Sequence, residues 1–232
     1  MRPPSQFGND ITNTTTNGNN DGDGFDPNGN GGGPIPPSIA HLGGTLICAR
    51  LAGNGVIRVV RRCDDAKENG TNLDLSECQL MQVPDAVYHL MRNTELKTCD
   101  LSCNVIKKIP PKFAVKFSLI TDLNLSHNQM SKLPDELADL ALERLDISHN
   151  SFTTLPQVVF KMPKLRQLYA NNNSIIEVES DEKTIKSESL ELVDLRNNPL
   201  TPQCYDRLRG AKLHFHLELS ERVQEDWEDL TI

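Results

Sequence analysis

The sequence predicts an α/β solenoid, in which a short curved stack of repeats has a parallel sheet on its concave face and a capping helix at its amino-terminal end. Three observations lead to this prediction. One pattern of apolar residues recurs six times, at steps of 22 to 26 residues. Proline-containing segments return the chain between several copies, and an amphipathic stretch precedes the first copy. Self-similarity at such a period is typical of stacked repeats.

Each copy holds two apolar residues separated by one polar residue, then an Asn or Cys. In the third copy the pair is Leu123 and Leu125, and Asn128 follows. Because side chains alternate across a strand, we expect Leu123 and Leu125 to face the core and Asn124 to face solvent. The chain then turns, and a buried Asn can bond backbone groups that the turn leaves unpaired. The predicted ladder of such residues is Cys78, Asn104, Asn128, Asn150, Asn173 and Asn198.

These repeats resemble the intracellular, Ras-group style of leucine-rich repeat. Several copies continue with an apolar residue, a proline and a further apolar residue three positions on, namely Val87, Phe113, Leu137 and Val159. Residues from about 55 to 200 also resemble the leucine-rich repeat-containing protein 20 family, through residues 73–80, 91–93 and 197–200. The resemblance implies a leucine-rich-repeat horseshoe and carries little information about activity.

An amphipathic helix is predicted to cover the first repeat. Its apolar stripe follows helical spacing and consists of Val56, Val59, Val60 and Cys63. Asn54 precedes the stripe as a start signal. Three arginines lie outside the stripe, namely Arg58, Arg61 and Arg62. They form either a solvated helix face, which is the favoured interpretation, or a partner or phosphate site.

Composition divides the rest of the chain. Residues 1–45 hold 10 of the 14 glycines, with many Asn, Asp and Pro residues, and are expected to be disordered. A capping helix region at 46–70 and about six repeats at 71–210 follow. A capping strand is expected at 211–220, where Leu213, Phe215, Leu217 and Leu219 alternate with polar residues. Residues 221–232 form an acidic tail.

The charge is concentrated in the two tails. The net charge of the chain is −8, of which residues 1–45 carry −3 and residues 221–232 carry −4, leaving −1 for residues 46–220. A nearly neutral body lacks the basic footprint that nucleic-acid binding requires. We therefore expect no direct contact with nucleic acid.

The cysteines and the apolar runs bear on the compartment. The six cysteines are scattered without paired spacing, at Cys48, Cys63, Cys78, Cys99, Cys103 and Cys204. This usage is typical of a reducing compartment, so we expect an intracellular, cytoplasmic protein, with a nuclear location left open. The apolar run at residues 39–52 is interrupted by Gly and Arg residues and is too short to cross a bilayer. No membrane segment is expected.

Residue types used by hydrolases occur at 126–128 and 148–150, which both read Ser-His-Asn. Adjacent residues on a strand and turn diverge, whereas a catalytic triad has to converge, so we expect no enzyme. His127 and His149 should lie side by side and could ligate a metal, as could His214, His216 and Glu218. Exposed polar side chains are the favoured interpretation of both sets, and no cofactor or metal is expected.

The concave face is the candidate site. The solvent-directed strand positions form one predicted column of Asp74, Asp100, Asn124, Asp146, Tyr169 and Asp194, with Arg144 and Arg196 beside it. This column is either a solvated sheet face or a protein interface. Tyr169 and Leu192 favour an interface, because an aromatic and an apolar residue on an open sheet suit an anchor.

The resulting hypothesis is a monomeric, non-catalytic adaptor or regulatory subunit that holds a protein partner of unknown identity on the concave face. The alternative is an accessory subunit of a nuclear ribonucleoprotein or chromatin complex, whose acidic tail meets a basic partner.

Overall fold

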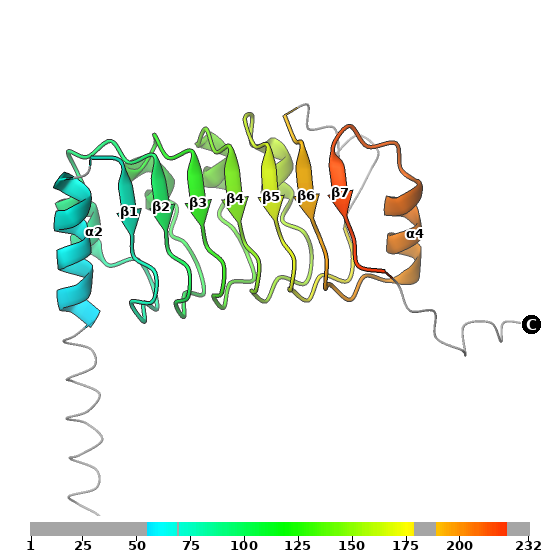
Figure 1. Ribbon diagram of the computed structural model, residues 1–232, viewed down its shortest axis with the longest axis horizontal. Coiled ribbons are helices and arrows are strands. Elements are labelled where there is room, and N and C mark those ends of the chain that lie inside the picture. The colour runs from blue at the N-terminus through cyan, green and yellow to red at the C-terminus, as the bar shows by residue number, and fades with distance from the viewer. Residues whose placement is uncertain (1–54, 69, 179–188, 222–232) are drawn as a thin grey trace, which may run out of the picture. The chain divides into compact units, whose positions relative to one another are not determined.

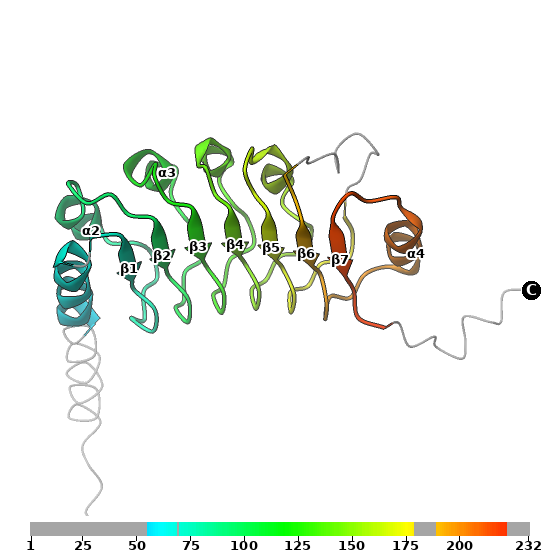
Figure 2. The ribbon, with the colours of Figure 1, turned by 45° about the horizontal axis from the view of Figure 1, so that its top comes forward.

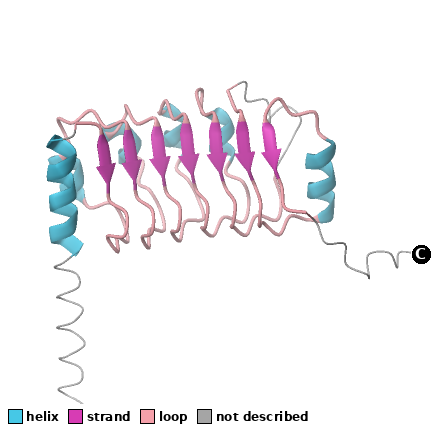
Figure 3. Cartoon of the chain, viewed as in Figure 1, coloured by secondary structure: helices cyan, strands magenta, loops and turns pink. Residues whose placement is uncertain are grey.

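The computed structural model describes residues 55–68, 70–178 and 189–221 (Figure 1). The segment 1–45 that was expected to be disordered, the start signal Asn54 and residues 222–232 of the acidic tail lie outside these residues. In the described part of the chain, seven strands form one parallel sheet in the order of the sequence. The row of strands lies on one side, and short helices lie behind it (Figures 2 and 3). The predicted solenoid is confirmed.

Each strand is three residues long. The strands are β1 (Asn72–Asp74), β2 (Thr98–Asp100), β3 (Asp122–Asn124), β4 (Arg144–Asp146), β5 (Gln167–Tyr169), β6 (Leu192–Asp194) and β7 (His216–Glu218). Equivalent residues of consecutive repeats lie opposite one another, so that Leu73 pairs with Cys99 and Cys99 with Leu123. These middle residues are buried. Alternation along the strand therefore places the first and third residues on the concave face.

The returning segments form short helices on the convex side. They are α2 (Asp85–Leu90), α3 (Lys112–Lys116) and the 3₁₀ helices η1 (Asp135–Asp139) and η2 (Gln157–Lys161). A proline precedes each one, and its fixed φ suits the entry into a helix. The predicted apolar positions Val87, Phe113, Leu137 and Val159 are fully buried. The proline therefore sets where each returning segment begins to pack on the core.

Residues 55–68 form the helix at the amino-terminal end. Val59, Cys63 and Ala66 face the core and are buried. Val56 was expected in this stripe, but its exposed fraction is 64%, and that of Val60 is 39%. This part of the prediction is wrong, because the helix contacts the first repeat along a narrower line than its apolar stripe and leaves one flank open.

Two arginines of this helix bind the first repeat. The Arg62 guanidinium donates to the backbone oxygen of Ser76 at 2.6 Å and to the Asp74 carboxylate at 2.9 Å. Arg58 donates to the backbone oxygen of Glu77 at 2.6 Å. The favoured interpretation of a solvated face is therefore wrong for Arg62, which is partly buried against the turn of the first repeat. Arg58 is exposed, as that interpretation expects, and adds one hydrogen bond to the same turn.

The carboxyl-terminal end contains a helix that the sequence analysis missed. Helix α4 (Pro202–Gly210) begins after Thr201, whose hydroxyl oxygen accepts the backbone N–H of Cys204 at 3.2 Å. Cys204 and Leu208 are its buried residues. The chain then enters β7, which pairs in parallel with β6 inside the predicted capping segment 211–220.

Candidate protein-interaction site on the concave face

The asparagines of the ladder lie beneath the turn that follows each strand. The amide nitrogen of Asn128 donates to the backbone oxygens of Leu125 and Ser126 in its own repeat, both at 3.1 Å, and to that of Leu101 in the preceding repeat at 2.9 Å. Its side-chain oxygen accepts the N–H of Ile106 at 2.9 Å. Each such side chain therefore joins two consecutive repeats through buried backbone groups that would otherwise lack partners.

The same pattern recurs along the row. Equivalent bonds are made by Asn104, Asn150, Asn173 and Asn198. Cys78 occupies the first position, and its backbone N–H donates to the side-chain oxygen of Asn104 at 3.1 Å. Burial raises the pKa of the Cys78 thiol above its ordinary value. These residues belong to the scaffold that holds the concave face in place.

The residue before each ladder position has a left-handed backbone. This row consists of Glu77, Cys103, His127, His149, Asn172 and Asn197, with φ between 52° and 56°. A left-handed conformation is unfavourable for most residues other than Gly and Asn. Sequence reasoning identified the ladder but did not identify this strained neighbour.

The predicted concave column is present in register. Asp74, Asp100, Asn124, Asp146, Tyr169 and Asp194 are successive partners in the sheet, and Glu218 follows them. The column also has a structural role that the sequence analysis did not assign. One oxygen of Asp100, Asn124 and Asp146 accepts the backbone N–H two residues on, at 2.8, 3.0 and 2.9 Å. These bonds close the turn after each strand.

Asp194 departs from the prediction. Its side chain is 2% exposed, so it is not a solvent-directed carboxylate. Arg196 covers it, donating from Nε to Oδ1 at 3.0 Å and from a terminal nitrogen to Oδ2 at 2.7 Å. The same guanidinium lies 3.0 Å from Glu218. Asp194 and Arg196 therefore neutralise each other, and they are poor candidates for the recognition of a charged partner.

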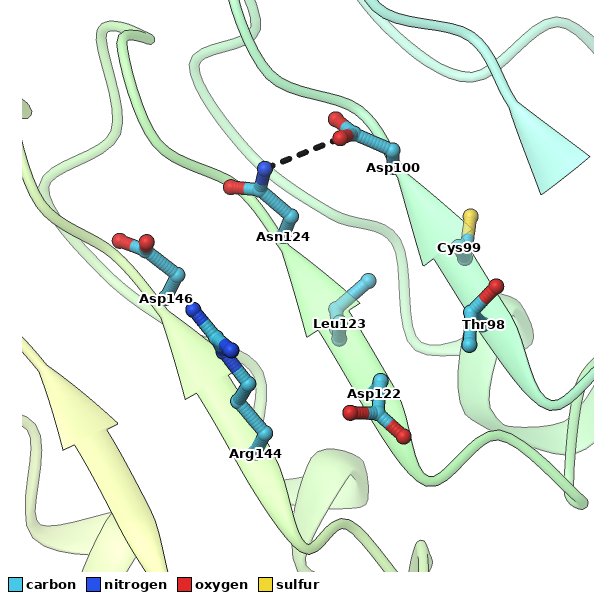
Figure 4. Close-up of a pocket in the computed structure, with 8 residues that line it drawn as sticks. All are labelled: Thr98, Cys99, Asp100, Asp122, Leu123, Asn124, Arg144 and Asp146. Carbon is cyan, nitrogen blue, oxygen red and sulfur yellow. Dashed lines mark hydrogen bonds between the residues drawn. The ribbon is translucent and has the colours of Figure 1, made fainter. Parts of the chain in front are cut away.

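A hollow lies over the middle of the column, among β2, β3 and β4 (Figure 4). Its volume is about 250 Å³, and its polar lining consists of Thr98, Asp100, Asp122, Asn124, Arg144 and Asp146. Both hydrogen bonds to Asp146 fall on its Oδ1. Among the described residues, its Oδ2 has no hydrogen-bond partner. The hollow therefore presents carboxylate oxygens that the turns do not use.

Tyr169 lies beside this hollow on β5. Its ring is half-buried, and the Arg144 guanidinium carbon lies 4.8 Å from the ring centroid. The Tyr169 hydroxyl donates to Gln167 Oε1 at 3.4 Å. A cation over an aromatic face is attractive and restricts both side chains. The structure thus brings together Arg144, Asp146 and Tyr169, and it places Asp74 apart from them beside Arg62.

The histidine pair lies at the turns. The rings of His127 and His149 stack with centroids 4.0 Å apart, so the two residues lie side by side as the sequence predicts. Of the second set, His216 lies 3.8 Å from Glu218. In the described ranges no group of three or more His, Cys, Asp or Glu residues is placed to hold a metal ion. The helices of those same ranges include none that is long and apolar enough to cross a membrane.

Known proteins share this repeat. A family model described as leucine rich repeat matches residues 94–152. The chain contains leucine-rich repeats and has the leucine-rich-repeat fold. Leucine-rich repeat-containing protein 20 of Homo sapiens is 34% identical over 91 residues, which cover 38% of this chain and 50% of that protein. The Mus musculus protein of that name is 32% identical over 94 residues, covering 39% and 51%. The matched part spans about half the length of these relatives.

A solved structure supports the same fold. A leucine-rich-repeat protein of Leptospira interrogans matches with a TM-score of 0.53 and 27% identity, covering 63% of this chain and 36% of that chain. The leucine-rich-repeat fold is typical of protein-interaction modules, and the concave face is the surface that this fold presents as an open sheet.

Proposed function

We propose that this leucine-rich-repeat protein is a non-catalytic adaptor or regulatory subunit that holds a protein partner on its concave face. The observation that carries the proposal is the hollow at β2 to β4, which is lined by Asp100, Asp122 and Asp146. Tyr169 lies next to Asp146 on the neighbouring strand. A rigid sheet holds these side chains, so a partner meets them without ordering a loop first.

The charges of the hollow favour a partner with basic side chains. Three carboxylates and the single guanidinium of Arg144 line it, and Arg144 is held over Tyr169. Exposed carboxylates in one hollow repel one another, and a cation from a partner relieves that repulsion. Complementary charges of this kind mainly raise the rate of association and select among partners.

Tyr169 supplies the apolar part of the proposed contact. Aromatic residues near the centre of an interface contribute much of the binding energy, since they bury a large area at little cost in side-chain entropy. The contact with Arg144 already restricts the ring. The acidic hollow and Tyr169 therefore form one continuous candidate surface, with the charges on one flank and the anchor on the other.

The test begins by finding the partner through proximity labelling with the intact chain. Its affinity is then measured for Asp100→Asn and Asp146→Asn at two salt concentrations. Asn is the matched substitution, because Asn124 already closes the same turn in the same column. We expect slower association and a weaker dependence on salt in both variants, with the melting temperature unchanged in Asp146→Asn. Asp100→Asn also loses the bond that the Asn124 amide donates to Asp100 Oδ2 at 3.0 Å, so its melting temperature should fall slightly.

Tyr169→Ala tests the anchor. We expect binding to weaken by about 2 kcal/mol, roughly 30-fold, with folding nearly unaffected. Lys132→Glu and Lys161→Glu on the convex side are the controls and should change little. Loss of binding in these controls, together with full binding by Tyr169→Ala, would place the site elsewhere. Loss of the main partners after nuclease treatment would favour the ribonucleoprotein alternative instead.

A further inference from the structure

An open apolar groove lies between the helix at 55–68 and the turn of the first repeat. Its volume is about 560 Å³, and its lining includes Val56, Val60, Leu80, Met81, Pro84 and Ala86. The exposed fraction is 64% for Val56 and 73% for Met81. Contiguous apolar surface of this kind is unfavourable in water and marks a place where another apolar group binds.

The position of the groove explains why it is open. Along the solenoid, backbone hydrogen bonds join the turn of each repeat to the turn of the preceding one. The N–H of Val105 donates to the backbone oxygen of Leu80 at 3.0 Å, and the N–H of Gln129 donates to the backbone oxygen of Ile106 at 3.0 Å. The first repeat has the helix on its other side. Because that helix packs through Val59 and Cys63, its flank at Val56 and Val60 stays uncovered. The helix therefore covers only part of the apolar surface at the amino-terminal end of the solenoid.

The chain itself supplies an occupant of suitable chemistry and length. Gly55 lines the groove, and the amino-terminal segment outside the described residues, 1–54, joins the chain at this residue. The adjoining residues 45–52 read Thr-Leu-Ile-Cys-Ala-Arg-Leu-Ala, with one charge among eight residues. Gly53 and Asn54 follow, directly before the helix, and these residue types favour a reversal of the chain. Eight extended residues span about 26 Å, which is ample to cross a groove of this volume.

We propose that residues 45–52 fold back at residues 53–54 and bind this groove through their apolar side chains, which would cover the amino-terminal end of the solenoid within the same chain. A tether of two residues gives the segment an effective concentration in the millimolar range or above. A second copy of the chain would have to reach a comparable concentration in solution to displace it.

The first experiment uses the full chain carrying Leu46→Asp and Leu51→Asp. The methyl signal of Met81 is followed by NMR in protein with labelled methionine, together with the fluorescence of a dye that binds apolar surface. We expect the Met81 signal to move toward that of a solvated methionine and the dye fluorescence to rise severalfold. The matched control, Phe7→Asp with Ile11→Asp, adds the same charge outside the segment and should leave both readouts unchanged.

The second experiment changes the groove and observes the segment. In a Cys103→Ser background, Cys48 is the thiol to be labelled, since Cys63, Cys78, Cys99 and Cys204 are buried. We expect Val56→Asp with Met81→Asp to raise the rate of Cys48 alkylation by tenfold or more. Both substituted side chains are exposed, so the fold should tolerate them.

Three outcomes would overturn the proposal. One is alkylation of Cys48 in the parent at the rate of a free peptide of residues 44–53. Another is a Met81 signal that does not respond to the segment variant. The third is a Met81 signal that changes with protein concentration alongside dimer formation, which would assign the groove to a second copy.

Discussion

Two rows that consist mainly of Asn and Asp side chains run the length of the sheet, one beneath the turns, called the inner row, and one on the concave face, called the outer row. In the inner row, Asn128 uses its amide on three carbonyl oxygens and its oxygen on an N–H group, so that both ends of the side chain are occupied. In the outer row, Asp146 closes its turn with Oδ1 alone. The inner row is committed to the fold, whereas Asp146 in the outer row leaves its Oδ2 without a hydrogen-bond partner among the described residues.

This difference explains how a repeat protein varies its surface without losing its scaffold. The outer position needs only one acceptor oxygen, and Asp100 and Asn124 both provide it. The choice between Asp and Asn then sets the charge of the concave face at little cost to the turn. The inner position needs a donor and an acceptor on one short side chain, which Asn supplies and Asp does not.

Asn128→Ala should show the largest effect on stability. It leaves the carbonyls of Leu101, Leu125 and Ser126 without this donor, and the expected loss is about 1 to 3 kcal/mol. Chemical denaturation measures it. Cys78→Ala at the end of the row is the comparison and should cost less, because a thiol makes none of the amide bonds. Wild-type stability in Asn128→Ala would remove the inner row from this account.

Asp146→Ala should cost less than the inner substitution, about 1 kcal/mol, because it removes one acceptor at a partly exposed turn. Asp146→Asn should leave the free energy of unfolding unchanged. The pair separates the structural oxygen from the charge. If Asn and Ala were equally destabilising, the charge rather than the acceptor would support the turn, and the proposed division of roles would fail.

The periodicity of the sequence was sufficient to predict the register of both rows. Spacing alone aligned Asp74, Asp100 and Asp146, because stacked repeats of similar length place equivalent residues opposite one another. The turn-closing role of the outer row had a signal in the recurrent Asp-x-Ser and Asn-x-Ser pattern, which was not used. The Thr201-Pro202 pair was likewise a sufficient signal for the start of α4.

Other features depend on contacts between segments that periodicity does not describe. Asp194 shares its column with exposed or partly exposed residues, yet it is buried because Arg196 folds back over it. Val56 fits the helical stripe, yet it is exposed because the helix packs on the first repeat through Val59 and Cys63. The hollow beside Tyr169 arises from side-chain positions on neighbouring strands. None of these follows from the pattern within one repeat.

Alkaline pH offers a second way to disturb the packing at the amino-terminal end of the solenoid. Burial raises the pKa of the Cys63 thiol to about 11 from its ordinary value of 9.0, and burial also raises that of Cys99. The folded state favours the neutral thiol, so this stabilisation is complete below pH 9 and is lost as the pH rises toward 11. We expect the melting temperature to decline over this range and the decline to be shallower in Cys63→Ala. Equal slopes in the two proteins would contradict the assignment.

The smallest expected effect concerns the left-handed residue between the two rows. Cys103 has φ 54° and is exposed, whereas the equivalent residues Asn172 and Asn197 have the residue type that tolerates this conformation best after Gly. The Asn197 amide also donates to the Asn172 side-chain oxygen at 3.1 Å. Cys103→Asn should therefore stabilise the protein by roughly 0.5 kcal/mol, through relief of backbone strain.

Cys103→Val is the matched control for this substitution. A β-branched side chain is strongly disfavoured in the left-handed region, so it should destabilise the fold by about 1 kcal/mol or more. Both variants remove the thiol, and the difference between their denaturation midpoints isolates the backbone effect from the loss of sulfur. If the Asn and Val variants had the same midpoint, the turn would relax around residue 103. The rigid turn between the inner and outer rows, on which the comparison depends, would then be a property of the middle repeats alone.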